Sequence, residues 1–491
     1  MNEFDTRLVR SGPLRTYLGG VRLRGLSLWL TGVLGSALVG LLSHRLGLGP
    51  FSLAAVAAIS LACLLALSVQ KVHGSAYLVF FFVVVGVAAD MLAGHSHLQA
   101  QGTQLDRLEA GLLLLAALWA LVGYRRQAPI ALIVTGVGLL SVELAAYWIH
   151  GFPLHVLFTG TSLYLRYFLL AYFVYMSAFD SRDLDAVMKV LAFFILAMTA
   201  VAAVQFSTGR LLMYFTGDYG AVTRASLTRA VGFFPWPNEF ALFCGTLFFL
   251  YASRALSSRL YLVTTIALGV GVILSGTRWS IFLVIGLLLL WGARQPKRWV
   301  RSTFLVLAVA TIAIAFASTL TSALWDLRFY AEGKSPRIMY FEQGLRVWSD
   351  NILFGVGFGR YGTEWDANME GAQNTVLAKY GIARPVIVLP NGHVRTLATT
   401  DSFLASLLPE FGLVGSLILG GFLVVLIRWG VGLARVIPHS SGYTLTILFL
   451  ALSTLTSSSA IVAPHALILW VVIGLLLKWG CSAYGGVGVT A

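Results

Sequence analysis

Long apolar runs recur along this chain of 491 residues and constrain its fold more than any other feature of the sequence. A helix of about 20 apolar residues crosses a bilayer, and about 14 runs of roughly that kind can be counted. Hydrophobic residues make up 58% of the chain and charged residues only 11%, against about 25% charged residues in a soluble domain. We therefore expect an all-α polytopic membrane protein with about 14 transmembrane helices. The composition argues against a soluble enzyme, a disordered protein and a nucleic-acid-binding protein.

The apolar runs divide the chain into five segments. Residues 1–206 carry predicted transmembrane helices 1–7, residues 239–324 carry helices 8–11, and residues 402–491 carry helices 12–14. A smaller loop at 207–238 and a large loop at 325–401 separate these groups. The large loop is the only segment long enough to form structure outside the membrane.

Basic residues orient the predicted helices. With the N-terminus inside, about 18 Lys and Arg residues fall in inner segments, while the short outer loops hold only Arg45, Arg107 and Arg278. Both termini are therefore predicted to be cytoplasmic, and the two longer loops are predicted to be periplasmic. Much of the net charge of +14 then reflects orientation in the membrane and does not indicate a nucleic-acid partner.

The cysteines and the N-terminal segment indicate neither a special site nor a cleaved signal peptide. Cys63, Cys244 and Cys481 are scattered in or beside apolar runs, so they indicate neither a disulfide framework nor a metal site. A basic segment precedes the first apolar run, but no small-residue cleavage site follows a short apolar core. We therefore expect residues 26–42 to be a retained first span.

The large loop contains three local patterns. Residues 324–341 are expected to be helical, and residues 386–389 followed by Pro390-Asn391-Gly392 predict a short strand and a turn. Residues 351–361 carry glycines at 355, 357 and 359, which allow positive φ angles and close backbone approach. This spacing does not indicate a dinucleotide site, because no βαβ pattern surrounds it.

Arginines on the outer side need an explanation other than orientation. The smaller loop carries Arg224 and Arg229, and it lies beside Arg278 in the predicted topology. Asn238 follows two prolines and is a natural N-cap for the next helix, but capping does not explain the arginines. A guanidinium binds a phosphate in bidentate fashion, so we expect a bound anion. For Arg278 the alternative is a side chain that extends to the membrane interface.

Several acidic residues lie at or inside predicted helices. Asp401 could cap the helix that begins at 402, which would not exclude a catalytic role. Glu410 lies deeper in that helix, and an intramembrane carboxylate suggests a functional site unless it pairs with a buried polar group. Glu143 and Arg166 lie on either side of one short outer connection, so we expect an ion pair between them.

Four of these segments together resemble the O-antigen ligase and Wzy-type polysaccharide polymerase superfamily. The resemblance covers roughly the C-terminal half of the chain, and the N-terminal spans match only in general character. Each motif alone is weak, and the specificity comes from four motifs in the right order on the same predicted side. The matching segments are Arg229 to Asn238, Ser275-Gly276-Thr277-Arg278, Arg337 with Phe354–Gly359, and Asp401 to Gly415.

The resemblance implies a GT-C-like glycosyltransferase of the bacterial inner membrane with a periplasmic active site. Its donor and acceptor would be glycans linked to undecaprenyl pyrophosphate, and it would need neither a cofactor nor a metal. Membrane lipid, a chain-length regulator and a flippase are the implied partners. Arg229 and Arg278 match the pyrophosphate-binding arginines, and Asp401 would be the catalytic base. Further predicted substrate-binding residues are Arg224, Arg337, Arg346, Arg360, Glu410, His393 and Asn238.

The sequence departs from the ligase pattern at Asp401, where ligases have histidine. A carboxylate can also serve as a general base, so the change favours a polymerase that joins repeat units over a ligase that transfers glycan to lipid A-core or another acceptor. His393 is the alternative base. A polysaccharide or lipid transporter is a third hypothesis, and the lack of an evident internal repeat disfavours it.

Overall fold

The structure is a computed structural model, and the part of it that can be described covers mainly the C-terminal two-thirds of the chain. The predicted spans within 26–123 and 303–324 lie outside this part, except for the helical residues Ser75 and Val79. The described residues are 75, 79, 130–152, 154–177, 179–208, 223–224, 227–232, 234, 237–293, 336–361, 386–388, 394–396, 403–434, 440–453 and 465–484.

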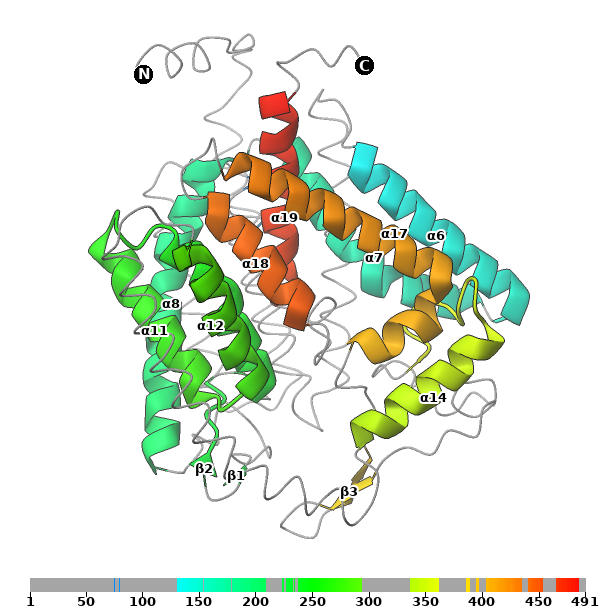
Figure 1. The fold of residues 1–491 in the computed structure, drawn as a ribbon, viewed down its shortest axis with the longest axis horizontal. Helices are drawn as coiled ribbons and strands as arrows, with labels where there is room; N and C mark the ends of the chain where they lie inside the picture. Colours follow the sequence, from blue (N-terminus) through cyan, green and yellow to red (C-terminus); the bar gives the residue numbers. More distant parts are fainter. Residues whose placement is uncertain are drawn as a thin grey trace, which may run out of the picture.

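This part of the chain is mostly helical, as expected for an all-α protein (Figure 1). Two small antiparallel hairpins lie in the two loops, formed by β1 (Thr223–Arg224) with β2 (Leu227–Thr228) and by β3 (Val386–Val388) with β4 (Val394–Thr396). Strand β3 confirms the strand predicted at residues 386–389, whereas the predicted turn at 390–392 lies outside the described residues. The helices are α6 (Ile130–His150), α7 (Leu154–Met176), α8 (Ser181–Thr208), α10 (Pro237–Ala252), α11 (Arg259–Leu274), α12 (Arg278–Ala293), α14 (Pro336–Asp350), α17 (Phe403–Leu433), α18 (Ser440–Ser453) and α19 (His465–Tyr484).

Three of the described helices are long and apolar enough to cross a membrane, namely Ile130–His150, Arg182–Thr208 and Ser406–Leu433. Each falls on an apolar run of the sequence, which is consistent with a membrane protein. Shorter apolar helices that also fall on such runs are Arg259–Leu274, Arg278–Gly292, Ser440–Ser453 and Ala466–Trp479.

Helix α14 differs from the expectation for the large loop. The sequence predicted a helix at 324–341, whereas α14 continues to Asp350, and residues 324–335 lie outside the described part. Pro336 suits the first helical position, where no N–H partner is needed. Val347 packs in a buried cluster with Val356 and Tyr361, so tertiary contact extends the helix beyond its apolar start.

Helices α10 and α19 form the interior of the bundle. The residues of α10 from 240 to 251 and those of α19 from 466 to 477 are all buried, as expected for helices that are apolar on every side. Helix α10 packs against α11 and α18, and α19 packs against α7. In Figure 1, α18 and α19 lie between the group α8, α11 and α12 and the group α6, α7 and α17.

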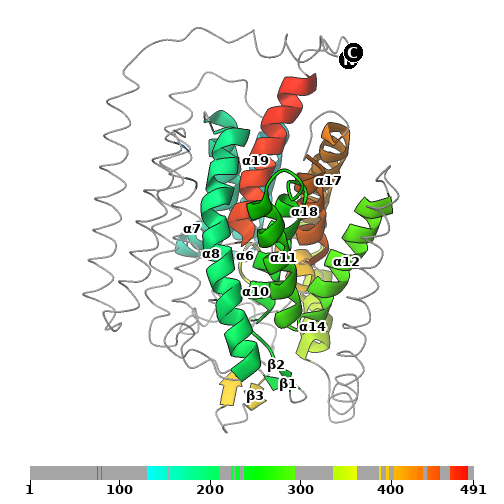
Figure 2. The same cartoon turned by 90° about the vertical axis from the view of Figure 1, so that its left-hand side faces the viewer.

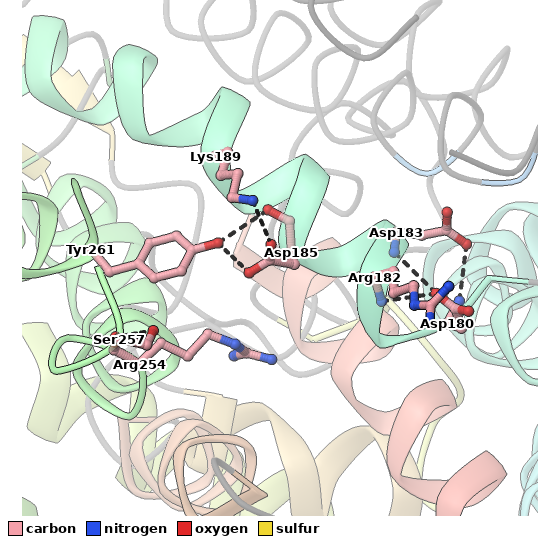
Figure 3. Close-up of polar contacts among 8 residues, drawn as sticks. All are labelled: Asp180, Arg182, Asp183, Asp185, Lys189, Arg254, Ser257 and Tyr261. Atoms are coloured by element: carbon pink, nitrogen blue, oxygen red, sulfur yellow. Dashed lines mark hydrogen bonds and ion pairs between the residues drawn. The ribbon is translucent and has the colours of Figure 1, made fainter. Parts of the chain in front are cut away.

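One end of the bundle, where α8 and α11 begin, is closed by charged side chains (Figure 3). The Asp180 carboxylate accepts the N–H of Asp183 at 3.1 Å, and the Asp183 carboxylate accepts the N–H of Asp180 at 3.0 Å. This reciprocal pair caps the start of α8. Lys189 pairs with Asp185 at 2.9 Å, and the Tyr261 hydroxyl donates to the same carboxylate. These contacts join α8 to α11.

Two buried cations bind polar groups of the protein at the same end. Lys478 donates to the carbonyl oxygen of Ser177 at 3.0 Å and to that of Phe179. Arg254 donates to the Tyr443 hydroxyl, and its guanidinium lies 5.3 Å from the centre of that ring. Cations are favourable at helix C-termini, where carbonyls lack helical partners. Figure 2 shows β1, β2, β3 and α14 at the opposite end of the bundle.

Candidate functional site

Arg229 follows the β1–β2 hairpin, and three hydrogen bonds fix its side chain. Its Nε donates to the carbonyl oxygen of Ser275 at 2.9 Å. One terminal nitrogen donates to Asn238 Oδ1 and to Thr277 Oγ1, each at 3.0 Å. The structure therefore brings the smaller loop together with the Ser-Gly-Thr-Arg turn, which lies 46 residues further along the chain.

The N-termini of α10 and α12 converge on this arginine. Helix α10 begins at Pro237, and α12 begins at Arg278. The Thr277 hydroxyl, just before α12, lies 3.3 Å from the carbonyl oxygen of Pro237 and 3.2 Å from Asn238 Oδ1. Each helix N-terminus carries partial positive charge. Two such ends lie beside Arg229, and helix N-termini favour anions, so the anion expected at Arg229 and Arg278 stays a prediction.

Two backbone features shape this cluster. Pro237 takes the first position of α10, so Asn238 lies inside the first turn, and its side chain accepts from Arg229 where we had expected a helix cap. Gly276 has a φ of 61°, and a Cβ there would lie 3.2 Å from Arg229 Cγ. Glycine therefore lets the turn pass close beside the arginine.

A buried glutamine outside the predicted site holds the segment that follows Arg229. Gln205 of α8 accepts the N–H of Val231 at 3.1 Å and the N–H of Gly232 at 2.9 Å. Its side-chain nitrogen donates to the carbonyl oxygen of Gly232 at 3.0 Å. The one signal for this residue in the sequence is an amide side chain at the end of an otherwise apolar run.

Replacing Gln205 by leucine is expected to lower the thermal unfolding temperature clearly. The change leaves two N–H groups and one carbonyl buried without a partner, at about 1–3 kcal/mol each. The matched control on α8 is Thr199→Val, because the buried Thr199 hydroxyl has no hydrogen-bond partner among the described residues. Thermal unfolding of both variants in detergent measures the difference. Equal unfolding temperatures would contradict the role given to Gln205.

The glycine-rich turn at 351–361 lies against a break in α17. The break is at Gly412, with φ 62° and ψ −169°. The N–H of Val356 donates to the carbonyl oxygen of Pro409 at 2.7 Å, and the N–H of Gly357 donates to that of Glu410 at 3.1 Å. The turn thus supplies donors to two carbonyls that the break leaves without helical partners.

The same turn also supplies acceptors to α17. The N–H of Leu413 donates to the carbonyl oxygen of Ile352 at 2.7 Å, and the N–H of Val414 donates to that of Leu353 at 3.1 Å. In an unbroken helix these two N–H groups would bond to the two carbonyls just described. Two helical hydrogen bonds are therefore replaced by four bonds to the turn. No backbone group involved in the exchange loses its partner.

Glu410 is completely buried and binds the turn through its side chain. One carboxylate oxygen accepts the Tyr164 hydroxyl at 2.5 Å and the N–H of Gly359 at 2.9 Å. The other oxygen accepts the N–H of Tyr361 at 3.1 Å. These bonds provide the hydrogen-bond donors that a buried carboxylate needs, and they tie Glu410 to the turn and to α7.

Glu143 of α6 binds the turn from the other side. It accepts the N–H of Phe358 at 2.6 Å and pairs with Arg360 at 3.2 Å. Arg360 also donates to the carbonyl oxygen of Val356 at 2.9 Å, and its guanidinium lies 4.0 Å from the centre of the Phe152 ring. Burial lowers the pKa of Arg360 below its usual value, and the Glu143 carboxylate opposes that shift.

The ion pair expected between Glu143 and Arg166 is therefore wrong. Arg166 donates to the Tyr167 hydroxyl at 2.9 Å and lies over that ring, with its guanidinium carbon 4.7 Å from the ring centre. The two residues lie on neighbouring helices, but the inserted turn brings Arg360 to Glu143. The short connection between the two helices therefore does not make the side chains of Glu143 and Arg166 point toward each other.

The three glycines of the turn confirm the predicted backbone freedom. Gly355, Gly357 and Gly359 have φ angles of 68°, 98° and 70°. At Gly357 a Cβ would lie 2.8 Å from a terminal nitrogen of Arg360 and 2.9 Å from a carboxylate oxygen of Glu143. The N–H groups of residues 357, 358, 359 and 361 bond to oxygens of the protein itself. These four N–H groups of the turn therefore donate to acceptors within the protein.

For the remaining predicted site residues, the structure gives at most the element in which each residue lies. Arg224 lies in β1, Arg337 in the first turn of α14, and Arg346 is exposed on α14. His393 and Asp401 lie outside the described residues. The structure thus joins Arg229 to Asn238 and to Thr277, which directly precedes Arg278. It places Arg360 and Glu410 together at the glycine-rich turn.

Among the residues that the structure describes, no group of three or more His, Cys, Asp or Glu side chains could hold a metal ion. Comparisons of the chain with protein-family models and with curated protein sequences found no match.

Proposed function

We propose that this protein is a membrane glycosyltransferase that polymerises oligosaccharide repeat units linked to undecaprenyl pyrophosphate. The observation that carries the proposal is the Arg229 cluster. Two arginine motifs, distant in the sequence and each predicted to face a pyrophosphate, meet where two helices begin. The oriented guanidinium and the helix ends supply fixed positive charge, which is the requirement of an anionic leaving group.

In the proposed reaction a hydroxyl of the acceptor glycan attacks the anomeric carbon of the donor. The bond from that carbon to the pyrophosphate oxygen breaks, and the lipid pyrophosphate leaves with both electrons of the bond. Arg229 and Arg278 stabilise the negative charge that develops on it. The proton of the attacking hydroxyl goes to the carboxylate of Asp401, with His393 as the alternative base.

The internal contacts divide the other predicted residues into two groups. Asn238 orients Arg229, and Glu410 and Arg360 hold the glycine-rich turn, so in this proposal these three residues have structural roles and do not bind substrate. Arg224 in β1, Arg337 in the first turn of α14 and the exposed Arg346 are candidates for contacts with the glycan or the pyrophosphate.

The proposal also includes the number of transmembrane helices and their orientation in the membrane. It has about 14 transmembrane helices, both termini in the cytoplasm of a bacterial cell, and the loops at 207–238 and 325–401 on the periplasmic face of the inner membrane. The charge pattern supports it, because Lys478 binds the carbonyl oxygens of Ser177 and Phe179, just before α8 begins. The strands β1, β2 and β3 and helix α14 lie at the other end of the bundle (Figure 2). A chain-length regulator and a flippase are the proposed partners.

Arg278→Ala and Asp401→Asn are expected to abolish long-chain polysaccharide and to leave single lipid-linked repeat units. Each variant would be expressed in cells that lack the native gene, and the glycans would be separated by size after extraction of lipid. The matched control is Arg259→Ala, because Arg259 is exposed at the far end of the bundle.

Two other results would redirect the assignment. Long lipid-linked polymer that accumulates without transfer to an acceptor would indicate a ligase. Full-length polymer in both variants, at normal protein abundance, would contradict glycosyl transfer at this site.

A further inference from the structure

One edge of α14 carries apolar side chains that the protein leaves exposed. Phe341 is 43% exposed and Leu345 is 39% exposed, and the exposed Ile352 and Leu353 follow directly after the helix. Phe341, Leu345 and Trp348 are spaced by four and three residues, so they share one face of the helix. This apolar edge (Phe341, Leu345, Trp348, Ile352 and Leu353) differs from the polar exposed positions among residues 342–350.

The other faces of α14 have different character. Its exposed polar residues lie next to the apolar edge around the helix, and they include both charges and a hydroxyl. Val347 and Gly344 are buried on the face that packs against the protein. Helix α14 therefore has a buried face against the protein, an exposed polar face, and the apolar edge between these two faces. The exposed polar residues are Glu342, Arg346, Ser349 and Asp350.

The apolar edge is continuous with the exposed face of a candidate membrane span. Leu413 of α17 is hydrogen-bonded through its N–H to the carbonyl oxygen of Ile352 at 2.7 Å. Leu413, Leu417 and Val424 are exposed at spacings of four and seven residues, so they form one stripe along α17. Helix α14 packs against α17 at this end of the bundle (Figure 1). The exposed apolar surface thus runs from the span onto the α14 edge.

Tryptophans mark the same level of the bundle. Trp148, near the end of α6, is 81% exposed, and His150 two residues later bonds the carbonyl oxygen of Gly355 at 3.2 Å. Trp348 belongs to the apolar edge and is half-buried, and its indole N–H donates to the carbonyl oxygen of Ile352 at 3.3 Å. Tryptophan is enriched where a membrane meets water, because one part of the ring is apolar and another is polar.

We propose that α14 lies in the membrane–water interface, with its apolar edge among the acyl chains of one phospholipid leaflet and its polar side in water. The occupant of this surface is membrane lipid, and its chemistry is that of a long apolar chain beneath a polar headgroup. This inference rests on α17 as a membrane span, and it is independent of the proposed glycosyl transfer.

Spin-label accessibility in phospholipid vesicles tests the proposal. Cys63→Ser and Cys481→Ser remove two native thiols, and Cys244 is buried and can remain. A nitroxide would then be attached to Leu345→Cys on the apolar edge, to Ser349→Cys on the polar side, or to Leu417→Cys on α17. Each label is exposed to oxygen, which concentrates in lipid, and to a water-soluble nickel chelate.

We expect position 345 to resemble position 417, with a ratio of oxygen to nickel collisions several-fold higher than at position 349. A preference for nickel at 345 would place the edge in water. Weak access to both reagents would show that protein covers it. A preference for oxygen at all three positions would show that the whole helix lies in lipid. Each of these three results would overturn the proposal, and Phe341→Cys is the replacement if the protein with Leu345→Cys fails to fold.

Discussion

Replacing Arg229 by lysine is expected to reduce polymer synthesis by about 100-fold or more, the range observed when an oriented donor to developing charge is removed. Lysine keeps the positive charge, but a single ammonium cannot reproduce the planar fork that binds Ser275, Asn238 and Thr277. The charge would no longer be held in one direction. The rate would be measured with the purified protein in lipid discs, supplied with a lipid-linked repeat unit.

Two further variants separate orientation from charge. Asn238→Ala removes one partner of Arg229 and leaves Ser275 and Thr277, so its loss of rate is expected to be smaller than that of Arg229→Lys. Arg182→Lys is the matched control, because Arg182 is exposed at the far end of the bundle. An Arg229→Lys protein with the normal rate and normal thermal stability would rule out the role of Arg229 in the reaction.

Glu410→Ala is expected to destabilise the protein by about 3–5 kcal/mol, because three buried donors lose the acceptor they share, at about 1–3 kcal/mol each. The change leaves the N–H groups of Gly359 and Tyr361 and the hydroxyl of Tyr164 without their acceptor. Thermal unfolding in detergent would show a clear decrease in Tm. Tyr164→Phe removes only one donor to the carboxylate, so its cost is expected to be about 1.5–3 kcal/mol.

The control for Glu410 lies on the same helix beyond the break. The Ser416 hydroxyl donates only to the carbonyl oxygen of Gly412, within its own helix, at 2.6 Å. Ser416→Ala is therefore expected to change stability by less than about 1 kcal/mol. If Glu410→Ala unfolds at the same temperature as Ser416→Ala, the carboxylate does not hold the turn.

Local structure was largely predictable from the sequence. Apolar runs of the right length became helices, and the glycines at 355, 357 and 359 took the positive φ angles that their type allows. The strand at 386–388 followed from the short apolar run that precedes Pro390-Asn391-Gly392 in the sequence. These features depend on residues that are close in the chain. Their physical causes are therefore visible in a short window of sequence.

Partners across the bundle were not predictable in the same way. Glu143 pairs with Arg360, which lies 217 residues away, and not with Arg166 on the adjacent helix. Gln205 binds a loop through an amide that no pattern distinguished from an ordinary polar residue. Such contacts depend on how each helix is rotated about its axis, and that rotation is fixed by packing against several neighbours at once.

The break in α17 has a consequence for how this part of the protein can change during evolution. Helix α17 and the turn share one hydrogen-bonding pattern, with 352–357 on one side and 409–414 on the other. Inserting or deleting one residue in either segment would shift the register of all four backbone bonds together. We therefore expect the two segments to be inherited as one block. A chimera that takes only one of them from a relative should accumulate poorly, whereas a chimera that takes both should fold.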